Sequence, residues 1–240
     1  MILKPHARIV DIVLGIWQRV PAPVIHNLSK ARMLKLIFWH LAVDQKPGFY
    51  LEFGVAHGHS MRAAILANEF GKNSQLNVAR VDRLFYGIDT FEGFSSDNPI
   101  DGHPVWHSDS YTKPISEVRN RFKSFGPTVS FFKIDANDFG MKTNSEIERL
   151  TSRLDGFAAV ILFDMDLYNP TARALEWIEP YIQEGTFLLF DEFFAFGGSL
   201  KKGEARAVEE FKARHPKWIL RDFSSYGSGG KCFVVSRVCA

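Results

Sequence analysis

Residues 49–60 read FYLEFGVAHGHS, a short apolar run followed by a turn with two glycines. An amphipathic segment, residues 61–70, comes directly after the turn. This order is typical of a β-strand, a tight turn and the start of an α-helix, whose first backbone N–H groups lack partners within the helix. Gly54 and Gly58 would let the backbone approach a ligand closely, because glycine has no side chain to collide with it. The stretch therefore predicts a ligand-binding β–α turn.

The acidic residue ahead of the turn indicates the kind of ligand. The spacing from Glu52 to Gly58 is E-x-G-x-x-x-G, which differs from the glycine patterns of dinucleotide-binding and phosphate-binding loops. The turn has no lysine to meet a phosphate, and Glu52 favours a ligand that carries a positive charge, such as an amino group or a sulfonium. Ser60 would cap the helix or bind a ligand carboxylate. An ordinary β–α turn without a ligand is the alternative.

Composition limits the class of protein. The chain has 240 residues, of which 46% are hydrophobic, and this suits one large α/β domain. A net charge of +2 gives no reason to expect a nucleic-acid partner. Cys232 and Cys239 form neither a disulfide framework nor a zinc-binding spacing. We find no convincing signal peptide or membrane-spanning run, and we expect a cytoplasmic protein.

The first 47 residues are predicted to form a helical cap. Two amphipathic helices, at about residues 9–20 and 28–43, are separated by Pro21 and Pro23. A dimer contact, and hence a homo-oligomer, is the alternative role. Because these helices are only mildly basic, we do not expect them to rest on a membrane surface.

Residues 48–240 are predicted to form the main domain. Apolar runs that alternate with amphipathic segments predict five strands joined by helices, and then a helix and a terminal β-hairpin. This order predicts a doubly wound, mostly parallel seven-stranded sheet. The predicted strands are residues 49–53, 84–89, 129–134, 157–163, 186–190, 218–223 and 231–238.

Acidic residues follow several of these strands. Asp89 ends the second strand and Asp135 follows the third, and ligands of doubly wound sheets bind beyond the carboxyl ends of the strands. The Asp89 carboxylate would hold the hydroxyl groups of a ribose, or else cap a helix or lie in a solvated loop. The polar stretch 95–114, which contains His107, predicts a lid or binding loop.

The next two strands end in four carboxylates. Asp164 and Asp166 follow strand 157–163, and Asp191 and Glu192 follow strand 186–190. Carboxylates gathered at one sheet edge repel each other unless a cation lies between them. Oxygen ligands favour Mg²⁺, Mn²⁺ or Ca²⁺, so we expect a divalent-metal site. Alternatively, these acids cap helices or pair with arginine.

Taken together, these features of the chain resemble a known protein family. The order of elements and the E-x-G-x-x-x-G turn look like class I S-adenosylmethionine-dependent methyltransferases. More closely, the chain resembles the macrocin-type O-methyltransferases, which methylate sugar hydroxyls of natural products and need Mg²⁺. The motifs that carry the resemblance, over roughly residues 48–238, are Leu51-Glu52-Phe53-Gly54-Val55, Asp89-Thr90-Phe91-Glu92-Gly93-Phe94, Asp164-Met165-Asp166-Leu167-Tyr168, Asp191-Glu192 and Ala207-Val208-Glu209-Glu210-Phe211.

The resemblance implies roles for individual residues. Glu52, Gly54 and Ser60 would border the methionine part of S-adenosylmethionine, Asp89 would hold its ribose, and Asp135 would lie near the adenine. Asp166, Asp191 and Glu192 would hold Mg²⁺ or another divalent cation. The family commonly has Asp-Asp where this chain has Asp191-Glu192, and an aromatic residue and glycines where this chain has Ala56, His57 and His59.

The predicted reaction moves a methyl group from a sulfonium to a hydroxyl of a sugar or other small molecule. A metal would stabilise the alkoxide as it forms, and Asp164, Asp166 or His107 would take the proton. A catechol or carboxyl methyltransferase would use the same cofactor on another acceptor. The alternative of a different class is a methyltransferase-like scaffold without catalytic activity, although four retained carboxylates argue against it.

Overall fold

The computed structural model describes residues 5–71, 81–93, 103, 112–140 and 144–238. The strands are β1 (Phe49–Phe53), β2 (Phe85–Asp89), β3 (Val129–Lys133), β4 (Ala158–Phe163), β5 (Phe187–Phe190), β6 (Trp218–Tyr226) and β7 (Gly230–Arg237). The α-helices are α1 (Pro5–Trp17), α2 (Ala22–Val43), α3 (His59–Gly71), α4 (Ile115–Arg121), α5 (Ser145–Thr151), α6 (Tyr168–Ile178), α7 (Ala195–Gly198) and α8 (Gly203–Arg214). The 3₁₀ turns are η1 (Lys123–Thr128), η2 (Ala136–Asp138) and η3 (Glu179–Tyr181).

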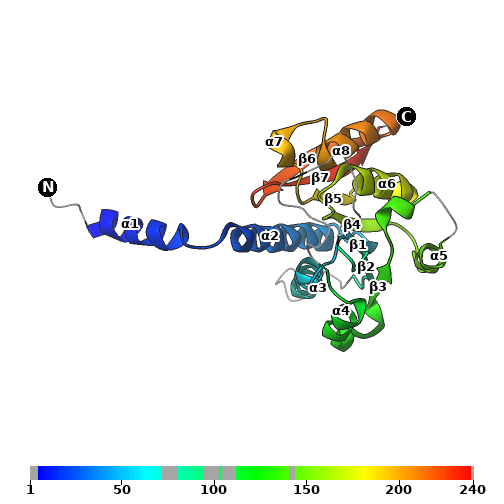
Figure 1. The fold of residues 1–240 in the computed structure, drawn as a ribbon, viewed down its shortest axis with the longest axis horizontal. Helices are drawn as coiled ribbons and strands as arrows, with labels where there is room; N and C mark the ends of the chain where they lie inside the picture. Colours follow the sequence, from blue (N-terminus) through cyan, green and yellow to red (C-terminus); the bar gives the residue numbers. More distant parts are fainter. Residues whose placement is uncertain (1–4, 72–80, 94–102, 104–111, 141–143, 239–240) are drawn as a thin grey trace.

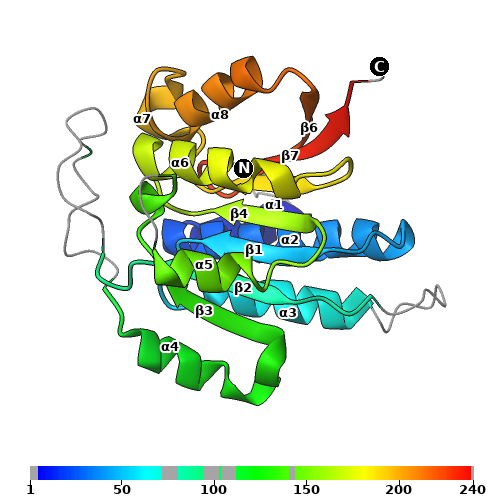
Figure 2. The ribbon, with the colours of Figure 1, turned by 90° about the vertical axis from the view of Figure 1, so that its right-hand side faces the viewer.

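The strands form one seven-stranded sheet in the order β3-β2-β1-β4-β5-β7-β6. β1 to β5 are parallel, β7 runs antiparallel to β5, and β6 pairs with β7 as a hairpin. The predicted doubly wound, mostly parallel sheet is therefore confirmed (Figures 1 and 2). The strand order reverses between β1 and β4, and in such sheets this reversal opens a crevice at the carboxyl ends of the strands.

Helices cover both faces of the sheet. Successive side chains of a strand point to opposite faces, so β1 sends Leu51 and Phe53 to one core cluster and Tyr50 to the other. The first cluster is closed by α5, α6 and α8, and the second by α2, α3 and α4. Because every residue of β4 and β5 is buried, these strands are apolar throughout, as expected for strands covered on both faces.

A stack of aromatic rings fixes the strand ends that lead to the predicted site. The ring of Phe163 on β4 lies between Phe53 of β1 and Phe190 of β5, with centroid separations of 5.3 and 4.8 Å and interplanar angles of 10° and 4°. All three side chains are fully buried. The residue after each ring is Gly54, Asp164 or Asp191, so packing beneath the sheet edge sets the positions of these residues.

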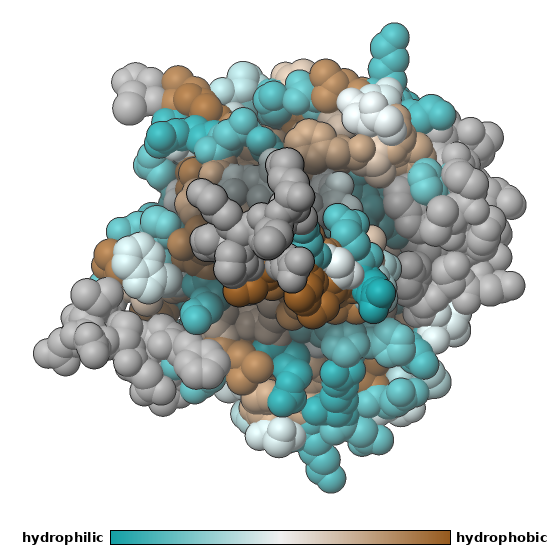
Figure 3. Space-filling view, turned by 90° about the vertical axis from the view of Figure 1, so that its left-hand side faces the viewer, coloured by the Kyte–Doolittle hydropathy of each residue, from teal (hydrophilic) through white to brown (hydrophobic). Residues whose placement is uncertain are grey.

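The two N-terminal helices differ in their surroundings. α2 packs against α3 and buries the side chains of Met33, Leu34, Ile37, Phe38 and Leu41. α1 projects from the body (Figure 1), and its apolar side chains from Ile9 to Trp17 are exposed. Seen from the N-terminal side, apolar atoms gather in the middle of this face (Figure 3). No helix in the described part of the chain has the length and apolar character needed to cross a membrane.

Two local predictions were wrong at their boundaries. β6 continues to Tyr226, so the hairpin loop is shorter than the predicted flexible connection over residues 224–230. Pro23 lies within the first turn of α2, where its missing N–H has no partner to lose. The helix α5 begins at Ser145, where the Asn144 side chain accepts a hydrogen bond from the Glu146 N–H.

Candidate active site

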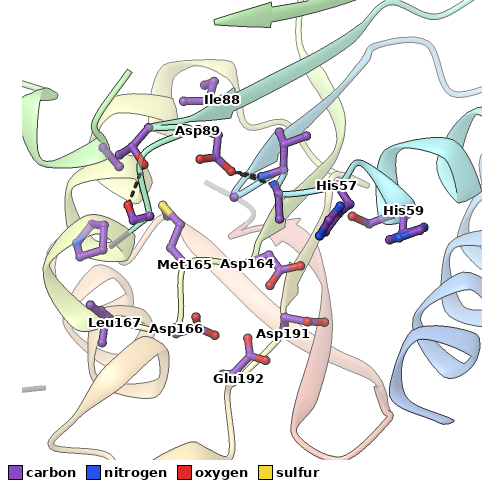
Figure 4. Close-up of a pocket in the computed structure, with 18 of the residues that line it drawn as sticks. His57, His59, Ile88, Asp89, Asp164, Met165, Asp166, Leu167, Asp191 and Glu192 are labelled. Carbon is purple, nitrogen blue, oxygen red and sulfur yellow. Dashed lines mark hydrogen bonds between the residues drawn. The ribbon is translucent and has the colours of Figure 1, made fainter. Parts of the chain in front are cut away.

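A cavity of about 530 Å³ lies at the carboxyl ends of β1 to β5. Eight of the eleven predicted site residues line it (Figure 4). They are Gly54, Ser60, Asp89, Asp135, Asp164, Asp166, Asp191 and Glu192. Glu52 and Gly58 are not among the described lining residues. His107 lies outside the residues that the structure describes, as does most of the predicted binding loop.

The glycine turn is tied to the neighbouring strand. Gly54 has a φ of +84°, and a Cβ atom there would lie 1.8 Å from the carbonyl oxygen of Asp164. The close approach that glycine permits at this position is therefore to the backbone after β4. At Gly58, with a φ of +73°, a Cβ atom would lie 2.6 Å from the ring of Phe122. Both glycines are required by the packing of this chain itself.

Asp89 holds the same turn from the β2 side. Its Oδ2 accepts hydrogen bonds from the N–H groups of Val55 at 2.7 Å and Ala56 at 2.9 Å, and its Oδ1 accepts one from Phe91 at 2.6 Å (Figure 4). Ala56 adopts a positive φ of 43°, which a residue other than glycine adopts only where its surroundings hold it. The Asp89 carboxylate thus fixes the turn from within the cavity wall.

Glu52 lies behind this wall and is fully buried. Tyr50 donates a hydrogen bond from its hydroxyl to Oε2 at 2.7 Å, and Ser60 donates one to Oε1 at 2.6 Å. Burial raises the pKa of Glu52 to about 8, although both hydrogen bonds act in the opposite direction. Glu52 is therefore joined to the cavity wall by its hydrogen bond with Ser60, which lines the cavity.

The far end of the cavity is formed by the loop after β3. Asp135 accepts hydrogen bonds at 2.9 Å from both the backbone N–H and the side-chain amide of Asn137, and so begins the short turn η2. Ile134 and Ala136 line the cavity beside it. This end joins apolar and polar groups, the kind of lining that small-molecule sites commonly have.

The opposite end is a cluster of carboxylates. Asp164 and Asp166 follow β4, Asp191 and Glu192 follow β5, and Glu204 comes from the first turn of α8. Figure 4 shows Asp164, Asp166, Asp191 and Glu192 gathered at one end of the cavity. Asp166, Asp191 and Glu204 are buried, and Glu204 accepts a hydrogen bond from the Glu192 N–H at 2.9 Å. The predicted gathering of acids from two strand ends is confirmed, with Glu204 as a further member.

Two basic residues of α2, neither of which was predicted from the sequence, enter this cluster. Lys30 Nζ lies 2.7 Å from Asp164 Oδ2 and 2.5 Å from Asp191 Oδ2. His26 Nδ1 accepts a hydrogen bond from the Ser228 N–H, so Nε2 carries the proton and donates to Asp191 Oδ2 at 2.9 Å. The side chains of Lys30 and His26 are only 6% and 10% exposed, so α2 forms part of the site.

The acids of this cluster outnumber their two basic partners, and most of them resist ionisation as a result. Burial and the neighbouring Asp191 raise the pKa of Asp164 to about 6, and burial and Asp164 raise the pKa of Asp166 to about 7. Burial and Asp166 also raise the pKa values of Glu192 and Glu204 well above the ordinary range. Asp191 differs: burial raises its pKa, but Lys30 and His26 outweigh burial and leave it below the ordinary value.

The donor set fits a divalent cation. Asp164, Asp166 and Glu192 place one carboxylate oxygen each within 4.8 Å of one another, as do His26, Asp191 and Glu192 with their ligand atoms. Among the acids of the cluster, Asp191 Oδ1, Glu192 Oε2 and Glu204 Oε1 are buried without a hydrogen-bond partner, which a cation would relieve. Of the predicted ligands, Asp166 and Asp191 fall into different groups, and Glu192 joins both.

Comparison with known proteins identifies the family. The family model described as macrocin-O-methyltransferase (TylF) matches residues 26–217. No curated protein is significantly similar to the chain in sequence. The match to the family model begins at His26, so it includes most of α2 and both of its basic site residues.

Solved methyltransferase structures share the fold. The calicheamicin methyltransferase CalS11 has a TM-score of 0.64 and 19% identity, covering 98% of this chain and 94% of its own. The O-methyltransferase NovP has a TM-score of 0.61 and 19% identity, covering 86% of this chain and 79% of its own. The SAH-bound methyltransferase PaMTH1 of Podospora anserina has a TM-score of 0.51 and 16% identity, covering 100% and 99%.

The family match spans most of the chain, the fold is that of these enzymes, and the glycine turn and strand-end acids meet in one cavity. The chain belongs to the macrocin-O-methyltransferase family and is an S-adenosylmethionine-dependent methyltransferase.

Proposed function

We propose that the protein methylates a hydroxyl group of a sugar or another small molecule, with a divalent cation bound in the carboxylate cluster. The observation that carries this proposal is the continuity of one cavity from Asp135 and the glycine turn to Asp166 and Glu192. It offers a cofactor end and an acceptor end within one space. A sugar acceptor is supported by CalS11, which is described as a TDP-rhamnose 3'-O-methyltransferase.

At the cofactor end, Asp89 and Ser60 are polar side chains that line the cavity beside the glycine turn. In our proposal, the methionine part of S-adenosylmethionine lies against Gly54 and Ser60, the ribose beside Asp89, and the adenine near Asp135. Glu52 acts indirectly by accepting the hydrogen bond of Ser60, and Gly58 acts by packing against Phe122. Because these groups are held by hydrogen bonds and packing, they are preorganised for binding.

At the acceptor end, Asp164, Asp166 and Glu192 would hold the cation, while Asp191 is engaged by Lys30 and His26. The cation would be Mg²⁺ or another metal that prefers oxygen ligands, and it would lower the proton affinity of the acceptor hydroxyl. Asp164 and Asp166 are the candidate bases. Burial raises their pKa values to about 6 and 7 in the metal-free protein, and a bound cation would lower these values and keep the carboxylates ionised and able to accept a proton.

The proposed methyl transfer accounts for every bond and proton. The acceptor oxygen forms a bond to the methyl carbon as the carbon–sulfur bond breaks, and the sulfonium becomes a neutral thioether. The hydroxyl proton passes to a carboxylate of the cluster and later to water. The protein's contribution is to align the two reacting atoms and exclude competing nucleophiles.

Calorimetry with S-adenosylhomocysteine, with and without Mg²⁺, tests the proposal, followed by methyl-transfer assays on nucleotide sugars, free sugars, catechols and carboxylic acids. Transfer to a sugar hydroxyl that EDTA abolishes is the expected result. Transfer only to catechols or carboxylates would contradict the acceptor class. Absence of cofactor binding would favour a scaffold, and full activity in EDTA would contradict metal assistance.

A further inference from the structure

The ammonium group of Lys30 lies between the ends of two strands that the family fold brings together. It contacts Asp164 after β4 at 2.7 Å and Asp191 after β5 at 2.5 Å. The β4 and β5 backbones are paired directly beneath these acids, with Phe163 opposite Phe190. The lysine therefore sits at the same kind of position that a metal ion shared by two strand ends would take.

Lys30 can be buried only because its ammonium group pairs with Asp164 and Asp191. Only 5% of the residue is exposed, and a buried ammonium without partners carries a large desolvation cost. Burial on its own would lower the pKa of Lys30, but Asp164 and Asp191 outweigh it and raise the pKa above the ordinary value. The two contacts, at 2.7 and 2.5 Å, have the geometry of an ammonium ion held between two carboxylates.

The contacts of Lys30 also determine which carboxylate oxygens remain for a divalent cation. Asp191 Oδ2 accepts from both Lys30 and His26, and Asp164 Oδ2 accepts from Lys30. The group formed by Asp164, Asp166 and Glu192 shares Asp164 with the lysine's contacts but not Asp191, and it includes the unpartnered Glu192 Oε2. A divalent ion there would be close to the ammonium and repelled by it.

We propose that Lys30 is a built-in counter-ion that occupies the position between Asp164 and Asp191, confines a divalent ion to Asp164, Asp166 and Glu192, and weakens the binding of that ion. This inference rests on the proposed function for the presence of an ion in the cluster. It does not depend on cofactor binding or on the acceptor. It assigns to α2 a direct part in setting the charge of the active site.

The test measures Mn²⁺ binding to the full chain and to its Lys30→Met variant. Electron paramagnetic resonance of free Mn²⁺ gives the bound fraction. Removing the ammonium removes a repulsive charge and frees two carboxylates, so Lys30→Met should bind Mn²⁺ at least about tenfold more tightly. Lys30→Arg should bind Mn²⁺ like the unaltered chain, because it keeps the charge. Lys35→Met is the matched control, since Lys35 is an exposed lysine of the same helix, and it should change nothing.

A second readout distinguishes charge replacement from loss of structure. In EDTA, Lys30→Met should have a lower melting temperature than the unaltered chain, and MnCl₂ should restore most of the difference. MnCl₂ should raise the melting temperature of Lys35→Met by less than that of Lys30→Met. If Lys30→Met does not fold in EDTA, Lys30→Gln, which keeps hydrogen-bond donors without the charge, takes its place in both measurements.

Mn²⁺ affinity that falls or stays the same in folded Lys30→Met would overturn the inference. So would the absence of Mn²⁺ binding in both the unaltered chain and the variant. Binding only in the variant would support it in its strongest form, with the lysine replacing the metal. S-adenosylhomocysteine titrations on the same samples separate this result from failure of the proposed function, because cofactor binding tests that proposal alone.

Discussion

The α-carbon of Gly54 faces the carbonyl oxygen of Asp164 so closely that a Cβ atom would lie 1.8 Å from it. The contact joins the turn after β1 to the first acid after β4, across the point where the strand order reverses. The cofactor end and the acceptor end of the cavity are thus connected by backbone packing. A substitution at this glycine acts on both ends, so its effect is not confined to ligand binding.

Gly54→Ala should therefore lower the free energy of unfolding by about 2–5 kcal/mol, from the positive φ and the collision with backbone together. Urea denaturation measures the change. Gly156→Ala is the matched control, since Gly156 has a positive φ of 75° with nothing within 4 Å of an added Cβ, and it should cost only about 1–2 kcal/mol. Equal losses at the two positions would show that the contact with Asp164 has no energetic weight.

Stability should depend on pH through Glu52. Its pKa is about 8 in the folded protein, above the unfolded value of about 4.3, so the folded state binds the extra proton between these values. The contribution is favourable at low pH and is lost as pH rises through this window, by up to a few kcal/mol.

Glu52→Gln should therefore reduce the fall in unfolding free energy between pH 5 and 8, because the amide resembles the protonated acid. Urea denaturation at several pH values measures this slope. Glu184→Gln, at an exposed glutamate, should leave the slope as in the unaltered chain. An unchanged slope in Glu52→Gln would mean that Glu52 does not carry the proton.

Replacement by asparagine should affect stability differently at two acids of the cluster, Asp191 and Asp166. Asp191→Asn removes a partner of buried Lys30 and should destabilise the protein by about 3–5 kcal/mol. Asp166→Asn removes a buried carboxyl group whose pKa is raised to about 7 by burial and by Asp164. The metal-free variant should be as stable as the unaltered chain or more stable.

Thermal unfolding in EDTA compares the two variants directly. Asp166→Asn should still lose metal binding and methyl transfer, because Asp166 belongs to the proposed cation group. The paired result separates an acid needed for the fold from an acid needed for chemistry. A larger destabilisation in Asp166→Asn than in Asp191→Asn would reverse this assignment.

Asp89→Ala should weaken binding of S-adenosylhomocysteine by about 10- to 100-fold, since the N–H groups of Val55 and Ala56 lose their shared acceptor. Calorimetry measures the affinity. Glu92→Ala is the control, because Glu92 pairs with Lys133 at the surface. Unchanged affinity in Asp89→Ala would show that the turn keeps its shape without this carboxylate.

Much of the fold follows from local patterns. The unbroken apolar runs of β4 and β5 predict strands buried on both faces, and the acids that follow them predict a cluster at the sheet edge. Parallel pairing then places Asp164 beside Asp191 without further information. Boundaries were less predictable, because the end of β6 depends on its pairing with β7 and the start of α5 depends on the cap at Asn144.

The basic half of the site was missed because it depends on contacts between distant parts of the chain. Lys30 lies 134 residues from Asp164 in sequence, and no local pattern joins them. One signal was present: Lys30 precedes Met33 and Leu34 by three and four residues, which places it on the apolar face of its own helix. A lysine at such a position is rarely buried without a carboxylate partner.

A crystal structure of the protein with S-adenosylhomocysteine and Mn²⁺, with an anomalous difference map at the manganese edge, tests the account most directly. We predict one manganese peak contacted by Asp164, Asp166 and Glu192, on the acceptor side of the cofactor's sulfur, with Lys30 still between Asp164 and Asp191. A peak in the place of the Lys30 ammonium, or a cofactor bound away from Gly54 and Asp89, would contradict it.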